Sequence, residues 1–97
     1  MTLHKDQIQK IANFFRKKPV LKAYVFGSFS RGRATEDSDV DLLVELDYSH
    51  PIGLDFIQMQ LDLQNILGKK VDLLSARGVS KHLFPILEKE KKLIYAR

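Results

Sequence analysis

Residues 39–46, DVDLLVEL, constrain the fold of this chain more than any other stretch. Val40, Leu42 and Val44 alternate with other residues, and this two-residue period is typical of a β-strand that buries one face. Asp39 and Asp41 begin the opposite face. Because residues two apart in a strand point to the same side, with backbones about 6.5 Å apart, we expect the two carboxylates to project together.

An amphipathic helix is predicted over residues 3–18, where apolar residues recur at helical spacing. Its candidate N-cap is Thr2, and Pro19 follows its end. After the strand at 39–46, residues 54–67 are apolar around much of a helix that Gly68 is expected to end. This helix is expected to be central to the core.

Four more segments complete the expected order. Strands are predicted at 21–26 and 70–75, and a helix at 80–90 whose start Pro85 shifts toward Phe84. Residues 93–95 are expected to form a fourth, edge strand rather than to continue that helix. The prediction is an α/β (α+β) domain over residues 1–97, a short mixed sheet of three to four strands with helices packed on it.

The composition is that of an ordinary globular chain, with 44% apolar residues and a net charge of +4. A pI near 9.4 suits a polyanionic ligand, although ordinary solubility charge explains it equally well. The absence of cysteine excludes a disulfide framework and a thiolate metal site. No apolar run resembles a membrane span or a signal peptide, so we expect a cytoplasmic protein.

Two carboxylates as close as Asp39 and Asp41 repel each other unless a cation lies between them, and Mg²⁺ prefers such hard oxygen ligands. Asp72 lies in the middle of the predicted strand KKVDLLS, where an unpaired charge is costly to bury. If the two strands are neighbours, Asp72 joins the pair and helps to hold a second metal ion. The alternative is that Asp72 pairs with Lys69 or Lys70.

The turn after the strand at 21–26 contains candidate phosphate-binding groups. Gly27 has no Cβ and so allows a phosphate close to the backbone, and a helix that begins at Ser28 would offer exposed N–H groups to an anion. Arg31, followed by Gly32, is placed to stabilise phosphate charge or to hold the loop. Such a pair of residues after a strand is also found in ordinary turns. With the carboxylates, these donors describe phosphoryl or nucleotidyl transfer.

The two motifs, Gly27-Ser28-x-x-Arg31-Gly32 and Ser38-Asp39-x-Asp41-Leu42, with a later strand that bears Asp72, resemble the minimal nucleotidyltransferase (MNT) domain of the DNA polymerase β-like superfamily. The resemblance implies the nucleotidyltransferase fold. It implies that Asp39 and Asp41 bind Mg²⁺ and that Asp72 completes a triad that holds two Mg²⁺ ions. It also implies that Asp72 orients or deprotonates the acceptor hydroxyl. It further implies contacts of Gly27 and Ser28 with the triphosphate of ATP, with Arg31, Gly32 and Ser38 shaping the loop and the turn.

Small members of this family are often antitoxins that adenylylate a tyrosine of a HEPN ribonuclease toxin. The resemblance therefore implies transfer of AMP from ATP to a partner protein of that kind, with neither a membrane nor nucleic acid as direct partner. Two alternatives remain: a non-catalytic antitoxin that neutralises the toxin by binding it, and nucleotidyl transfer to RNA or a small molecule.

Overall fold

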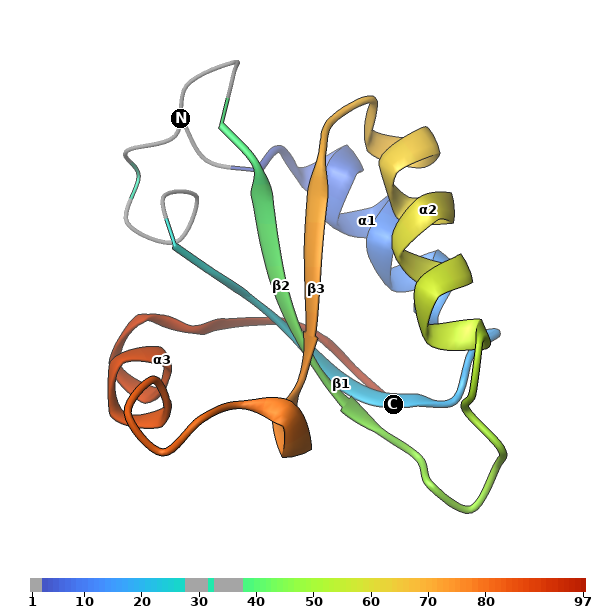
Figure 1. The fold of residues 1–97 in the computed structure, drawn as a ribbon. Helices are drawn as coiled ribbons and strands as arrows, with labels where there is room; N and C mark the ends of the chain where they lie inside the picture. Colours follow the sequence, from blue (N-terminus) through green and yellow to red (C-terminus); the bar gives the residue numbers. More distant parts are fainter. Residues whose placement is uncertain (1–2, 28–31, 33–37) are drawn as a thin grey trace.

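The computed structural model describes residues 3–27, 32 and 38–97 (Figure 1). Its elements, in chain order, are α1 (Lys5–Phe15), β1 (Val20–Phe26), β2 (Val40–Leu46), α2 (Asp55–Leu67), β3 (Val71–Ser75), the 3-10 helix η1 (Ala76–Gly78), α3 (Phe84–Glu90) and β4 (Lys92–Ala96). None of the helices in this described part has the length and apolar character needed to cross a membrane.

The four strands form one mixed sheet in the order β3-β2-β1-β4. β1 is antiparallel to both β2 and β4, and β3 runs parallel to β2. The predicted mixed sheet is therefore confirmed, and the C-terminal segment is an edge strand as expected. The parallel β2–β3 pair is possible because α2 connects the two strands and returns the chain to the same end of the sheet.

α1 and α2 cover one face of the sheet, and α3 lies on the other (Figure 1). The alternation in β2 directs Val40, Leu42 and Val44 into the core under α1 and α2, where all three are fully buried. Other fully buried core side chains include Ile11, Phe15, Val20, Met59, Leu63 and Val71. Asp41 and Glu45 consequently belong to the face that α3 partly covers.

α1 is shorter at both ends than the helix predicted over residues 3–18, whereas the last helix begins at Phe84, as Pro85 indicated. The N-cap of α1 is His4, not Thr2, and its backbone N–H donates to Gln7 Oε1 at 2.9 Å, which satisfies a donor that the helix leaves open. The last helix begins at Phe84, with Pro85 in its first turn, where a missing N–H costs nothing. As predicted, Gly68 ends α2 in the left-handed conformation, with φ 65°.

The outer edge of β3 is covered by two side chains of α2. The backbone N–H of Val71 donates to Gln64 Oε1, and that of Leu73 donates to Gln60 Oε1, both at 3.1 Å. Residues 60 and 64 are one turn apart on the helix, as residues 71 and 73 are one pleat apart on the strand. The side-chain amides thus stand in for the neighbouring strand that an edge strand lacks.

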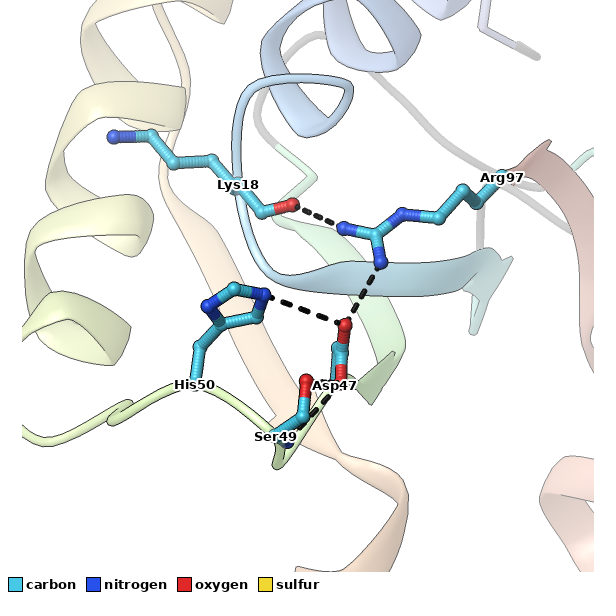
Figure 2. Close-up of polar contacts among 5 residues, drawn as sticks. All are labelled: Lys18, Asp47, Ser49, His50 and Arg97. Carbon is cyan, nitrogen blue, oxygen red and sulfur yellow. Dashed lines mark hydrogen bonds and ion pairs between the residues drawn. The ribbon is translucent and has the colours of Figure 1, made fainter.

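At the end of β2 far from Asp41, a polar network joins three segments (Figure 2). The Arg97 guanidinium donates to Asp47 Oδ2 at 2.9 Å and to the Lys18 carbonyl at 3.2 Å. Asp47 also accepts hydrogen bonds from the hydroxyl and the backbone N–H of Ser49. These donors, the Ser49 hydroxyl first, lower the pKa of Asp47 from 3.8 to about 2.

Candidate active site

Asp41 of β2 and Asp72 of β3 are directly opposite each other in the parallel pair. Directly opposed residues of neighbouring strands point to the same face, so both carboxylates lie on the α3 side of the sheet. They line one shallow hollow of about 360 Å³. Its other lining residues are Phe26, Gln60, Leu73 and Leu74. The strand of Asp41 and the strand of Asp72 are therefore neighbours, which is the arrangement that a shared site of these aspartates requires.

Asp39 immediately precedes β2 and is half-buried, with Oδ2 3.8 Å from Lys70 Nζ. Lys70, one of the two alternative partners of Asp72 in the sequence, therefore forms its ion pair with Asp39. Among residues 3–27, 32 and 38–97, no three carboxylate or histidine side chains are grouped closely enough to hold a metal ion. The predicted three-aspartate metal cluster therefore stays a prediction.

Gly27 follows β1 with a φ of 71°, a conformation that favours glycine. Phe26 is paired with Asp41, so Gly27 lies next to the Asp41 carboxylate. A Cβ built on Gly27 would overlap Asp41 Oδ2. Gly27 therefore makes room for the Asp41 side chain, and its predicted contact with a phosphate stays a prediction.

The other predicted residues of the phosphate loop are described only in part. Ser28 and Arg31, and with them the predicted helix start at Ser28, lie outside the described residues. Gly32 is exposed, with φ 69°, and Ser38 is half-buried directly before Asp39. The phosphate-binding roles of these residues stay predictions.

Gln60 was missed by the sequence prediction. It lines the aspartate hollow from α2 while its Oε1 accepts from Leu73 N–H. The sequence shows only a glutamine next to the buried Met59, on a helix that also carries Gln58 and Gln64, so it singles out Gln60 only when β3 is known to be an edge.

The residues present are suited to Mg²⁺. Asp41 and Asp72 supply hard oxygen ligands, and the ion commonly takes only one or two protein carboxylates and completes its shell with water and substrate phosphate. Because Gly27 has no Cβ, there is room for Asp41 Oδ2 beside the end of β1. When bound there, the ion would neutralise phosphate charge and polarise the reacting phosphorus.

Residues 8–95 match the family described as the nucleotidyltransferase domain. The chain belongs to this family. A relative from Thermococcus cleftensis named protein adenylyltransferase MntA is 40% identical over 73 residues, which are 75% of this chain and 67% of that protein. The enzyme class predicted from the sequence, nucleotidyltransferase, is confirmed.

Two solved structures share the fold of this nucleotidyltransferase. One, described as a candidate minimal nucleotidyltransferase, is 32% identical with a TM-score of 0.78, over 91% of this chain and 89% of that one. The other, a toxin-antitoxin crystal structure with AMP-PNP, has a TM-score of 0.77 at 24% identity, over 98% of this chain and 75% of that one. The predicted nucleotidyltransferase fold is confirmed.

Proposed function

We propose that this nucleotidyltransferase is a Mg²⁺-dependent protein adenylyltransferase that moves AMP from ATP to a hydroxyl of a partner protein. The observation that carries the proposal is the register of the parallel pair, which sets the Asp41 carboxylate beside that of Asp72. The name of the MntA relative supports AMP transfer to protein. The match to a toxin-antitoxin complex with AMP-PNP supports a toxin as the partner, and we propose a HEPN-type toxin with a tyrosine acceptor.

In this proposal the acceptor oxygen bonds to the α-phosphorus while the bond to the bridging oxygen of the β-phosphate breaks and pyrophosphate leaves. Asp72 accepts the hydroxyl proton, and Asp41, Asp39 and Asp72 would hold the Mg²⁺ that ATP carries. Gly27 and Ser28 contact the triphosphate, with Arg31, Gly32 and Ser38 shaping that loop. The attacking oxygen and the leaving oxygen lie on opposite sides of the α-phosphorus. If pyrophosphate leaves toward the end of β1, the acceptor hydroxyl therefore approaches from the side of β3.

The proposal is tested with the Asp41→Asn variant, the co-purifying partner protein, ATP and MgCl₂, with the mass of the partner as readout. The wild-type chain should add adenylyl groups, and the variant should be slower on the order of a thousandfold, because it loses a metal ligand that supplies several kcal/mol. The control is Asp55→Asn, a change of the same charge at an exposed site of α2. Equal rates for Asp41→Asn and wild type would refute the assignment.

A purely binding antitoxin is the second candidate, and the exposed face of α2 favours it. Leu54, Ile57 and Leu61 are 82%, 57% and 45% exposed although apolar, and their spacing puts them on one side of the helix. If binding alone neutralises the toxin, Asp41→Asn protects cells as well as wild type does. Loss of protection with the complex intact would instead require transfer.

A further inference from the structure

A second hollow lies on the same sheet face as the aspartates, between the sheet and α3. It measures about 250 Å³. Leu43 and Glu45 of β2 line it and point to the same side as Asp41, because they are two and four residues further along the strand. Leu43 is therefore about 6.5 Å from Asp41 along the strand. This distance is similar to the distance that a ribose spans between the α-phosphate and the base of a nucleotide.

The walls of this hollow are apolar on both sides. Leu43 forms the sheet side, Leu87 and Val79 lie opposite, and Phe84 stands at its rim, 53% exposed. A flat, mostly apolar ring system fits between such surfaces, and an exposed aromatic ring is a stacking platform for a base. Phe84 is otherwise an unexplained exposed aromatic residue.

The polar groups of the hollow form one connected set. The Tyr24 hydroxyl donates to Glu45 Oε2 at 2.6 Å, and Lys91 Nζ lies 4.4 Å from the centre of the Tyr24 ring. Lys91 Nζ also donates to Glu88 Oε1 at 2.7 Å. The Lys91–Glu88 pair thus offers a cationic donor directly beside a carboxylate acceptor.

This donor–acceptor pair is complementary to adenine. Adenine presents its N6 amino donor beside the N7 acceptor, whereas guanine presents two acceptors, O6 and N7, on the same edge. A carboxylate only accepts hydrogen bonds, so Glu88 receives the adenine amino group and would face guanine O6 without a bond.

We propose that the hollow between α3 and the sheet binds the adenine base of the nucleotide, with Phe84 stacking on the ring and the Lys91–Glu88 pair reading its edge. This inference rests on the proposed function. The triphosphate then lies toward Gly27, the α-phosphate over Asp41, and the base further along β2, which leaves the β3 side open for the acceptor.

The test measures the affinity of the full chain, by calorimetry with MgCl₂, for AMP-PNP and for tripolyphosphate, which has no base. Phe84→Ala should weaken AMP-PNP binding about tenfold, the loss typical of a removed base–aromatic stack, and leave tripolyphosphate binding unchanged. The matched control is Ile86→Ala, because Ile86 is 52% exposed on the same helix but does not line the hollow. It should change neither affinity.

If Phe84→Ala binds AMP-PNP as tightly as Ile86→Ala does, the base does not occupy this hollow, while the proposed function stands. If the wild-type chain binds no AMP-PNP at all, both the assignment of the hollow to adenine and the proposed function are wrong. A fall in tripolyphosphate affinity equal to that for AMP-PNP would also reject the hollow, since the variant would then act on the phosphates.

Selectivity gives a second readout. Glu88→Gln introduces an amide that can donate to guanine O6, so the preference for AMP-PNP over the guanine analogue GMP-PNP should fall several-fold while the fold is kept. Adenosine alone should shift the methyl resonances of Leu43, Val79 and Leu87 and leave those of Leu63, in the core on the other face, unchanged. An unaltered base preference in Glu88→Gln, or shifts confined to other methyl groups, would contradict the site.

Discussion

At the scale of single residues, Gly27 combines a left-handed backbone with contact to the Asp41 carboxylate. Gly27→Ala should cost about 1 kcal/mol of unfolding free energy for the backbone alone. The added Cβ should also displace Asp41, and a displacement of about 1 Å at a reaction centre lowers a rate on the order of a hundredfold. Urea denaturation and the rate of adenylyl transfer measure the two effects.

The control for Gly27→Ala is Gly68→Ala. Gly68 has a similar φ of 65°, but no atom lies within 4 Å of a Cβ built on it. It should therefore show the same loss of stability and keep the wild-type rate. Wild-type transfer by folded Gly27→Ala would mean that the position of Asp41 does not matter to the reaction.

The Tyr24 hydroxyl is a second single group with a measurable consequence. Its hydrogen bond to Glu45, then burial, then the charges of Glu45 and Glu88, raise its pKa from 10.0 to about 12. A group whose folded pKa is raised stabilises the fold fully below its unfolded pKa and loses that contribution as pH rises, here between about 10 and 12. Stability should therefore decline over that alkaline range.

An absorbance titration of phenolate formation checks this expectation. One of the three tyrosines should ionise last, and Tyr24→Phe should remove that late phase. Glu45→Gln should move it toward the ordinary pKa, because the charged acceptor is lost. A late phase that persists in Tyr24→Phe would show that another tyrosine is responsible.

At the scale of elements, α2 both fills the core and closes the edge of β3. Gln60→Leu and Gln64→Leu each remove the acceptor of one β3 backbone N–H, so each should lower the free energy of unfolding by about 1 kcal/mol. Urea denaturation midpoints measure the loss. The double variant should also self-associate at high concentration, because its strand edge is open.

The comparison for this pair is Gln58→Leu on the same helix. Gln58 is exposed, and its amide donates to Asp62 on the next turn of the same helix, so the change should stay within about 0.5 kcal/mol. If Gln58→Leu costs as much as Gln60→Leu, the effect comes from the helix and not from the strand edge.

At the scale of the whole molecule, the Asp47 network ties the C-terminal Arg97 to the turn before β1 and to the end of β2 (Figure 2). Because the folded pKa of Asp47 is lowered to about 2, its stabilising contribution is present above the ordinary value of 3.8 and disappears as pH falls through about 2. Asp47→Asn should therefore be less stable than wild type at pH 7, and the difference should shrink between about pH 4 and pH 2. Thermal denaturation at a series of pH values measures it, and a constant difference down to pH 2 would contradict the pKa.

The sequence predicted those features that depend on local periodicity. The alternation in residues 40–46 identified β2 and the face on which Asp41 lies, and Gly68 and Pro85 marked the end of α2 and the start of α3. These features are set by backbone conformation and side-chain burial within one element, so neighbouring residues are enough to show them.

What the sequence did not predict depends on which elements meet. The register that sets Asp41 opposite Asp72, the contact of Gly27 with Asp41 and the role of Gln60 at the β3 edge all join segments far apart in the chain. The hollow under α3 also joins segments that are distant in the chain, and no pattern in the sequence indicates that α3 packs beside β2.

The pairing of β4 with β1 has a consequence for synthesis in the cell. β1 receives one neighbour from β2 early, but its other edge waits for Lys92–Ala96, which leave the ribosome after the other three strands. A nascent chain therefore carries an open strand edge until β4 has been made, and during that period wrong strand pairing competes with folding. The sheet can close at β1 only once β4 is available, so a partner that binds the folded sheet should meet the domain after that point and not before.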